Sequence, residues 1–383
     1  MKKYLPSLIT SIVMLAFTGV ALAKDEIKPV TPQPKPQAKP QIEVCFVLDT
    51  TSSMSGLIEG AKQKIWSIAN EMIATKPTPD IRIGLVGFRD RGDEYVTRHY
   101  DLTNDIDAVY ANLTKFSAAG GGDTPESVNE ALNVAALKMS WSADKRVLKI
   151  IFLVGDAPPH MDYSNDVKYP DVCQAAMKRD LIINTVQCGG ITETAPIWQE
   201  IAKLGEGNYA AIAQSGGMAV IATPMDADIA SLNLKLGGTM IGYGDTATRR
   251  FVAEKQSYSE VAPASVAADR LSFNAASGVV VQGGGELLDE LAAGNVKLDG
   301  LKKESLPEDM RKLSETDLKT AINKKQEDRA EIQKQIAKLA KDRNDYITAE
   351  RSKTTTGKDD SFDEKVAGWI QSQATRKGIQ YGK

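Results

Sequence analysis

The sequence predicts an α/β fold with a doubly wound, mostly parallel sheet, followed by a helical C-terminal extension. Between residues 42 and 213, short apolar runs alternate with stretches of helical spacing. Continuous apolar runs are typical of strands buried on both faces. Strands that alternate with helices need crossover connections, which place helices on both faces of a parallel sheet. After residue 236 only helical spacing recurs.

The chain begins with a pattern of export. Residues 1–23 start with two lysines, continue through an apolar run and end in Ala-Leu-Ala, as in a bacterial signal peptide cleaved before Lys24. An uncleaved anchor is the alternative, but the run is short for a membrane span. Residues 24–41 hold five prolines and form an expected semi-rigid linker. We expect a periplasmic or secreted protein with no integral membrane span after cleavage.

The sheet domain is expected over residues 42–236. Its helices should alternate with the strands, with Pro125 in the first turn of one of them. A last helix over 223–236 should close the domain. The predicted strands cover residues 42–48, 81–88, 147–154, 181–187 and 209–213. The predicted helices between them cover residues 54–74, 105–116, 125–139, 171–178 and 197–204.

Beyond the sheet domain, residues 237–305 form a mixed helical linker region, and residues 306–383 form a helical, candidate coiled-coil region. A long amphipathic helix is predicted over 314–353, opened by a Ser-x-x-Asp cap. Lys325 and Arg329 interrupt its apolar stripe, so no heptad seam is sustained. The helix should fold back on the domain or on a neighbouring helix, with self-association as the alternative.

The end of the chain carries two further predictions. A hinge is expected over residues 353–360, because this stretch is short, polar and contains a glycine. A last short helix is expected over 361–379, with Val366, Trp369 and Ile370 as its apolar contacts.

Composition excludes several classes of protein. The chain has 383 residues, 42% of them hydrophobic, which excludes a wholly disordered chain. A formal charge of −3 gives no basis for nucleic-acid binding. Two histidines and three cysteines without CxxC or HxxxH spacing argue against a zinc site. Cys173 and Cys188 pair or remain free thiols, and Cys45 is expected as a buried apolar group.

Polar residues follow the predicted strands at three places. Asp49, Thr51 and Ser53 come directly after the first strand, Thr124 follows a run of glycines, and Asp156 follows the central strand. Each of these three groups, taken alone, is explained equally well as a helix cap or as turn residues. Because the carboxyl ends of parallel strands meet at one edge of a sheet, all five should converge. Their hard oxygen atoms suit Mg²⁺, with Mn²⁺ or Ca²⁺ as alternatives.

This order and spacing closely resemble the metal-ion-dependent adhesion site of a von Willebrand factor type A domain, in a bacterial secreted subgroup. Thr51 replaces the more common serine but keeps the hydroxyl. The resemblance implies that the five residues hold the metal and that an Asp or Glu carboxylate of a protein partner completes its coordination. It implies a binding module rather than an enzyme. Asp123, Asp90 and His160 would lie around these metal ligands or on the rim of the site.

Two alternatives stay open at this point. In the first alternative, the chain acts as a scaffold of an envelope complex through its C-terminal helix, and the metal site is secondary. Less favoured is a metal-assisted hydrolase, for which Ser53, Asp156 and His160 suggest a triad. No G-x-S-x-G element is present to support it. The integrin-type tripeptide Arg91-Gly92-Asp93 is expected to be structural, and Arg89 to Arg91 to shape the rim of the site.

Overall fold

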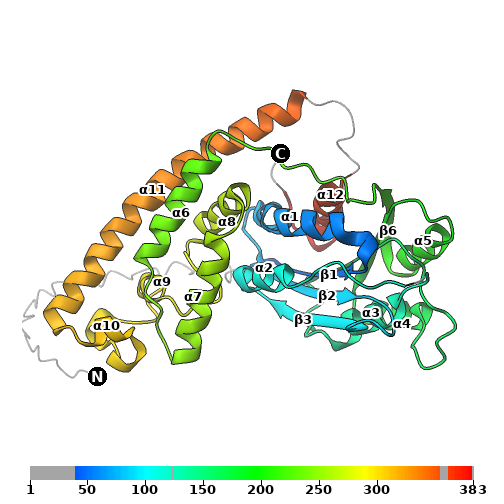
Figure 1. Ribbon diagram of the computed structural model, residues 1–383, viewed down its shortest axis with the longest axis horizontal. Coiled ribbons are helices and arrows are strands. Elements are labelled where there is room, and N and C mark those ends of the chain that lie inside the picture. Colours follow the sequence, from blue (N-terminus) through cyan, green and yellow to red (C-terminus); the bar gives the residue numbers. More distant parts are fainter. Residues whose placement is uncertain (1–38, 123, 354–360, 382–383) are drawn as a thin grey trace, which may run out of the picture. The chain divides into compact units, whose positions relative to one another are not determined.

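A computed structural model describes residues 39–122, 124–353 and 361–381. One six-stranded sheet organises the first part of the described chain, in the order β3-β2-β1-β4-β5-β6 (Figure 1). All neighbouring strands pair in parallel except β2 and β3, which are antiparallel. The strands are β1 (Gln41–Asp49), β2 (Asp80–Phe88), β3 (Thr97–Thr103), β4 (Leu148–Gly155), β5 (Ile182–Cys188) and β6 (Glu206–Ile212).

The predicted fold class is confirmed, and each predicted strand is present within a few residues of its expected bounds. Strand β3 was not predicted. Its sequence, TRHYDLT, is mostly polar, and only Leu102 among its residues is buried. An edge strand lies against a single neighbour, so it needs no continuous apolar run. Because β3 lacks such a run, the sequence pattern did not predict it.

Helices cover both faces of the sheet, as expected. One predicted detail is wrong, because Pro125 lies before the third helix rather than in its first turn, and that helix begins at Val128. The helices of this part are η1 (Ser52–Met54), α1 (Ser55–Ile73), α2 (Ile106–Thr114), α3 (Val128–Asn133), the π-helical turn η2 (Val134–Lys138), α4 (Tyr169–Met177) and α5 (Thr194–Leu204).

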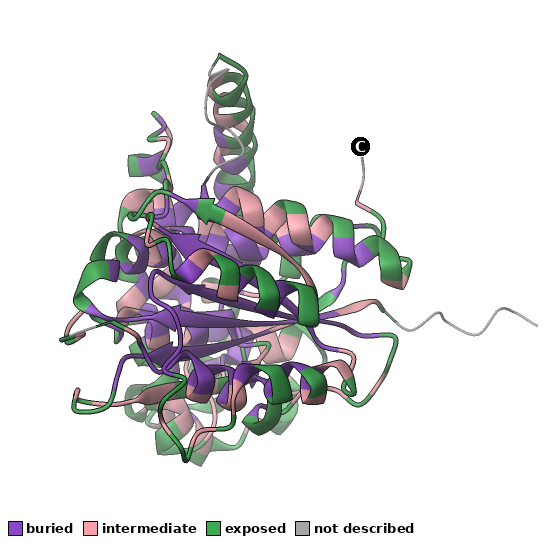
Figure 2. Ribbon diagram, turned by 90° about the vertical axis from the view of Figure 1, so that its right-hand side faces the viewer, coloured by how far each residue is buried: buried purple, intermediate pink, exposed green. Residues whose placement is uncertain are grey.

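The last helix, α12 (Phe362–Ala374), also belongs to the sheet domain. The Phe362 ring lies 6.1 Å from the Phe46 ring, and Trp369 stacks on Phe152 with the ring centroids 6.4 Å apart. Val366 and Ile370 are buried, as predicted. The central strands β1, β2, β4 and β5 are mostly purple in Figure 2, enclosed between the two helical layers, whereas the edge strands β3 and β6 are mostly intermediate or exposed. A segment from the C-terminus therefore completes a core that begins at residue 42.

A second, helical part of the chain lies between β6 and α12. The predicted long helix is confirmed, and its Ser314 hydroxyl accepts a hydrogen bond from the Asp317 amide at 3.1 Å. The turn η5 (Thr375–Lys377) follows α12. The helices of this part are α6 (Asp226–Thr239), α7 (Thr246–Glu260), α8 (Ala264–Ser277), α9 (Leu287–Ala292), η3 (Leu298–Gly300), η4 (Lys303–Ser305), α10 (Glu308–Arg311) and α11 (Glu315–Lys353).

Helix α6 corrects a prediction. It was expected to close the sheet domain, but it packs against α8 and α11. Its buried residues Ile229 and Leu232 share a cluster with Leu271 of α8 and Ile336 of α11. An apolar stripe on a helix requires a partner but does not specify which one, and here the partner is another helix.

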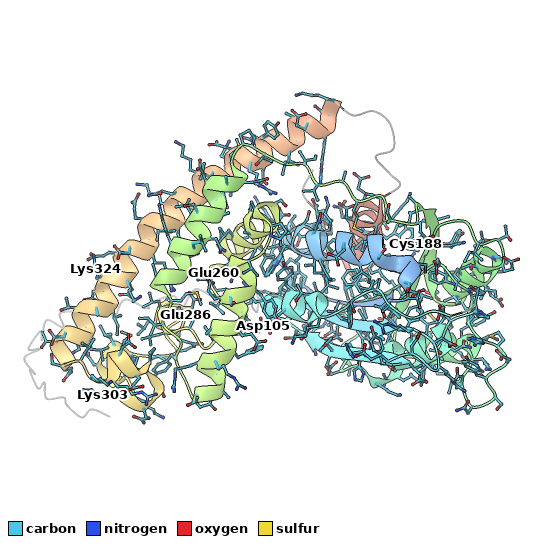
Figure 3. All side chains as sticks on the ribbon, in the orientation of Figure 1. Asp105, Cys188, Glu260, Glu286, Lys303 and Lys324 are labelled. Carbon is cyan, nitrogen blue, oxygen red and sulfur yellow. The ribbon has the colours of Figure 1, made fainter. Side chains whose placement is uncertain are left out.

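Buried ion pairs join the helical part to the sheet domain. Asp105, labelled in Figure 3, accepts a hydrogen bond from the Lys255 ammonium of α7 at 2.8 Å. Asp107 faces the Arg270 guanidinium of α8 at 2.6 Å, and both side chains are only 2% exposed. Both carboxylates belong to the start of α2, so this single turn anchors two helices of the helical part.

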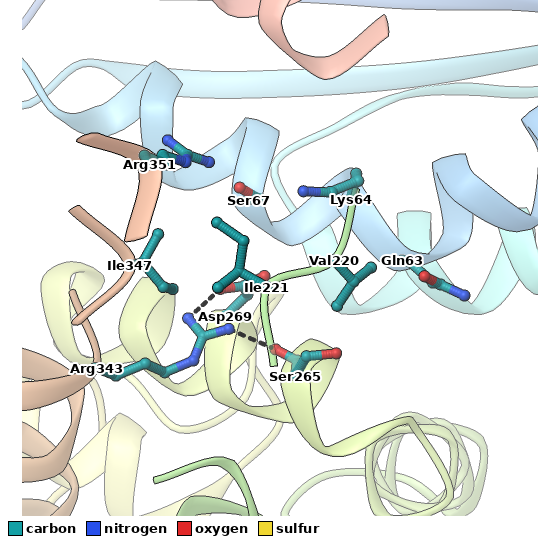
Figure 4. Close-up of a pocket in the computed structure, with 10 residues that line it drawn as sticks. All are labelled: Gln63, Lys64, Ser67, Val220, Ile221, Ser265, Asp269, Arg343, Ile347 and Arg351. Atoms are coloured by element: carbon teal, nitrogen blue, oxygen red, sulfur yellow. Dashed lines mark hydrogen bonds and ion pairs between the residues drawn. The ribbon is translucent and has the colours of Figure 1, made fainter. Parts of the chain in front are cut away.

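Further ion pairs hold α11 in place. Arg329, which interrupts the apolar stripe of the helix, is 5% exposed and contacts Glu286 at 2.8 Å. Arg343 contacts Asp226 of α6 at 2.8 Å and Asp269 of α8 at 2.6 Å. Figure 4 shows this guanidinium reaching Asp269 and the Ser265 carbonyl (Figure 4). Helix α11 therefore folds back on helices of its own chain, through arginines as well as apolar residues.

Three predictions lie outside the described residues: the signal peptide, most of the linker, and the hinge apart from residue 353. Within the described residues, no helix combines the length and apolarity needed to cross a membrane. The domain boundaries stay predictions.

Candidate metal centre

The first predicted cluster assembles at the end of β1. Asp49 is the last residue of this strand and is fully buried. Its Oδ1 atom accepts hydrogen bonds from the Thr51 amide at 2.8 Å and from the Thr51 hydroxyl at 2.7 Å. The Ser53 hydroxyl lies 3.2 Å from the Thr51 hydroxyl. An Asp that bonds the amide two residues on makes the chain turn sharply, and this turn places three predicted ligands side by side.

The glycine-rich loop closes against this turn. The carbonyl of Gly120 accepts hydrogen bonds from the Ser52 amide and hydroxyl, at 3.2 and 2.8 Å. A Cβ atom on Gly121 would lie 2.8 Å from the Cβ of Thr51, too close for any other residue. Thr124 follows on the same loop and is exposed, and its hydroxyl makes no hydrogen bond to another described residue. Asp123 lies outside the described residues.

Asp156 follows β4 and is 5% exposed. Its Oδ2 atom accepts a hydrogen bond from the Gln214 amide nitrogen at 2.8 Å. The same nitrogen lies 3.2 Å from the Ser53 carbonyl oxygen. Gln214 therefore links the end of β4 to the turn after β1. Sequence reasoning missed Gln214, because a lone glutamine after the last strand gives no signal.

Two buried carboxylates here each have one oxygen atom without a partner. The Oδ2 atom of Asp49 and the Oε2 atom of Glu126 have no hydrogen-bond donor within the described part of the chain. Burial raises the pKa of Asp49 to about 7, against hydrogen bonds from Thr51, and the charge of Asp156 adds to the rise. Burial raises the pKa of Glu126 to about 9, and the charges of Asp49 and Asp90 add to it. Buried polar atoms are normally paired, so this negative environment fits a cation.

Glu126 was not among the predicted site residues. A Cβ on Gly121 would lie 3.2 Å from its Oε1 atom and 2.8 Å from Thr51, so both side chains border the glycine loop. The available signal was a carboxylate in the segment GGGDTPES, two residues after Thr124.

The donor set limits the kind of metal. No group of three or more His, Cys, Asp and Glu side chains that could hold a metal ion exists among the described residues. A cation at this edge of the sheet therefore needs hydroxyl groups and water as well as the two aspartates. Mg²⁺ fits such a set, because it keeps several waters and takes few protein carboxylates.

The predicted rim residues lie together in a network of their own. Asp90 accepts hydrogen bonds from the Ser127 and Tyr163 hydroxyls, both at 2.7 Å. The His160 Nε2 atom lies 3.4 Å from Asp90, and Nδ1 lies 2.7 Å from Asp162. His160 and Asp90 are 7% and 5% exposed, so both are largely covered. His160 bonds Asp162, so the structure does not assemble the suggested triad with Ser53.

The tripeptide at residues 91–93 is engaged within the chain. Arg91 contacts Asp166 at 2.5 Å and lies over the Tyr163 ring. Asp93 accepts a hydrogen bond from the Gly121 amide at 3.1 Å, which fixes the glycine loop. The neighbouring Arg89 is buried and donates to the Thr50 and Ser117 carbonyls. These residues support the loops around the site.

All three cysteines are free and buried, which answers the open question of Cys173 and Cys188. Cys45 in β1 and Cys188 in β5 have β4 between them.

Comparison with known proteins shows what the sheet domain is similar to. Residues 43–224 match the family model described as von Willebrand factor A domain. This region is therefore similar to a von Willebrand factor A (VWA) domain. The VWA domain-containing protein 7 of Rattus norvegicus is 35% identical over 120 residues, which cover 31% of this chain and 12% of the relative. The Homo sapiens protein of that name is 33% identical over 120 residues, with the same coverage of both chains.

The chain thus spans about an eighth of the length of these curated relatives. Among solved structures, proximal thread matrix protein 1 from the mussel byssus has a TM-score of 0.36 and 16% identity, covering 46% of this chain and 42% of that chain. Another structure of that protein, with a TM-score of 0.35 and 17% identity over 45% of this chain and 41% of that chain, is described with a zinc-occupied MIDAS motif.

Proposed function

We propose that this chain is a secreted or periplasmic, divalent-cation-dependent protein-binding module rather than an enzyme. Its VWA domain would hold Mg²⁺ through Asp49, Thr51, Ser53, Thr124 and Asp156. The observation that carries the proposal is the turn after β1, where a buried, unpaired Asp49 oxygen lies beside two linked hydroxyls.

The charge of the donor set explains how such a site recognises a partner. Three of the proposed ligands are neutral hydroxyls and two are aspartates, so the site favours a cation without enclosing it in carboxylates. A bound Mg²⁺ supplies a positive charge and an open coordination position. The side chains of Ser53 and Thr124 are exposed, so a metal that they held would be accessible to a partner protein. An Asp or Glu of a partner protein then fits by charge and geometry.

Gln214 and Gly121 support this arrangement without being ligands. The Gln214 amide holds Asp156 against the Ser53 main chain. Gly121 allows the loop that carries Thr124 to approach Thr51. One metal-bridged carboxylate cannot supply nanomolar affinity alone, since each tenfold gain needs about 1.4 kcal/mol. The surrounding loops therefore add contacts to the partner.

The experiment compares partner capture from envelope extract in Mg²⁺ and in EDTA. Ser53→Ala is the informative variant, because Ser53 is exposed and its loss leaves the core intact. Ser55→Ala, an exposed hydroxyl at the start of α1, is the matched control. A partner retained in Mg²⁺ by the wild type and Ser55→Ala, and lost in EDTA and in Ser53→Ala, supports the proposal. Equal capture in all four samples contradicts it and favours a scaffold acting through the helical part.

A further inference from the structure

A cavity of about 280 Å³ lies at the amino ends of the strands, away from the candidate metal centre. We call it the basic pocket and define it by six of its lining residues. These are Trp141, Lys145, Lys149, Lys178, Arg179 and Asp180. From Lys149 at the start of β4 to Asp156 after its end, the strand extends roughly 23 Å. The pocket is therefore a separate place on the VWA domain and does not depend on the function proposed above.

Lys149 is the residue that makes this pocket unusual. Its side chain lines the cavity although the residue is 2% exposed. The ammonium donates to the Ser142 carbonyl at 3.1 Å and has no ion pair among the described residues. Burying a charge without an opposite charge is unfavourable. Burial accordingly lowers the pKa of Lys149, against the nearby charges of Asp180 and Glu43, which raise it.

The nearby carboxylates are already engaged. Glu43 is the partner of Lys149 in the β1–β4 register, but its Oε1 atom contacts Arg82 at 2.7 Å and its Oε2 atom accepts from the Ser142 amide at 2.8 Å. Asp180 contacts the Lys377 ammonium at 2.5 Å, which offsets its charge. The buried lysine thus faces the cavity with no carboxylate of its own.

The other cations of the pocket are also unpaired. Lys145 and Lys178 are exposed and make no ion pair within the part of the chain that the structure describes. Arg179 donates through Nη1 to the Ala136 carbonyl and has no carboxylate partner there either. Four positive side chains therefore line one small cavity. Trp141, half-buried beside them, adds an aromatic surface.

We propose that the basic pocket binds the phosphoryl group of a small organic phosphate. Lysine and arginine side chains recognise phosphoryl oxygens through charge-assisted hydrogen bonds. A dianion there would supply the opposite charge that Lys149 lacks. The volume suits a phosphate with a small attached group, and the Trp141 ring offers that group an apolar contact.

The test uses phenyl phosphate as the probe in titration calorimetry, with the full chain at constant ionic strength. The expected result is saturable binding of one phenyl phosphate per chain. Lys149→Met and Lys178→Ala should each weaken phenyl phosphate binding tenfold or more. Because Lys178 is exposed, its substitution leaves the fold intact even if Lys149→Met does not fold. Arg146→Ala is the matched control, because Arg146 is adjacent, exposed and paired with Asp144 outside the pocket. It should bind within twofold of the wild type.

A second arm separates the sources of the phosphoryl group. Vesicles of phosphatidic acid in phosphatidylcholine are compared with phosphatidylcholine alone. Phenyl phosphate binding without vesicle binding supports a soluble ligand, whereas binding of both, each weakened by Lys178→Ala, supports the same site with a lipid headgroup. Absence of saturable phenyl phosphate binding overturns the proposal. So does binding that survives both lysine substitutions, or that Arg146→Ala weakens equally.

Discussion

The sheet domain and the helical part are stabilised in different ways. Two large apolar clusters fill the space on either side of the sheet. The helical part has two smaller clusters, and buried arginines and a buried lysine hold its helices to one another and to α2. The sheet domain is therefore specified by its apolar pattern, whereas the helical part is specified largely by which charged side chains pair.

The largest expected effect comes from breaking a charge pair between the two regions. Arg270→Met leaves the Asp107 carboxylate buried and uncompensated, which we expect to lower the free energy of unfolding by about 3–5 kcal/mol. Urea denaturation measures it. The double variant with Asp107→Leu should recover most of the loss, because two apolar side chains can replace a buried pair. A single-variant loss below about 1 kcal/mol would contradict the role of this pair in joining the regions.

The next effect tests whether α12 belongs to the sheet domain. Phe362→Ala removes a buried ring that packs on Phe46, and should cost about 3 kcal/mol in the free energy of unfolding. Val261→Ala, at a residue that is 78% exposed, is the control and should stay within about 0.5 kcal/mol of the wild type. Equal stability of the two variants would show that α12 does not complete the core.

A smaller effect depends on pH. Burial raises the pKa of Asp226, but hydrogen bonds from the Thr223 amide and the Arg343 guanidinium outweigh it, so the pKa is lowered overall. Because the folded-state pKa is lowered, the ionised carboxylate stabilises the fold at pH values above the unfolded-state pKa of about 3.9. This stabilisation is lost as the pH falls through the folded-state pKa. Asp226→Asn should therefore cost about 1.5 kcal/mol at pH 7 and less at pH 3.

Asp228→Asn provides the control for this pH dependence. Asp228 is an exposed residue in the same helical turn, so its substitution should change stability little at either pH. A cost for Asp226→Asn that does not shrink at pH 3 would show that the carboxylate charge is not what holds α11 to α6.

The smallest expected change concerns the thiols of the sheet domain. Burial raises the pKa of Cys173 to about 12 and also raises the pKa of Cys45 and Cys188. Thiolate is the reactive form, so a thiol-specific reagent should label none of the three in the native protein and all three in denaturant. Cys188, labelled in Figure 3, lies close enough to Asp49 and Asp156 of the candidate metal centre for their charges to raise its pKa, and would be the first to react if that edge opened. A native thiol that reacts rapidly would contradict the closed core.

The sequence pattern predicted most of the sheet domain, because strands that are buried on both faces consist of continuous apolar runs. It missed β3, whose polar residues lie at an edge, and it assigned α6 to the wrong partner. It also read Arg329 as an interruption of the α11 stripe, although this arginine is buried against Glu286. Pairing between residues distant in the chain leaves no periodic signal, so such contacts need the structure.

In the candidate site, too, local features could be predicted from the sequence and contacts between distant residues could not. The sequence predicted that Asp49, Thr51 and Ser53 share one turn, because they are close together in the chain. In the structure, hydrogen bonds link these side chains. Glu126 and Gln214 were not found, since both reach the site only through the fold. The metal-ligand roles themselves stay predictions.

We propose above that the turn after β1 holds a divalent cation. The most direct measurement is titration with Mn²⁺ followed by electron paramagnetic resonance, with Mg²⁺ as competitor. We expect one saturable Mn²⁺ site per chain, from which Mg²⁺ displaces Mn²⁺. Binding should be weakened at least tenfold in Asp49→Asn and in Ser53→Ala, and unchanged in Ser55→Ala. No saturable Mn²⁺ binding, or binding that both Asp49→Asn and Ser53→Ala retain in full, would contradict it.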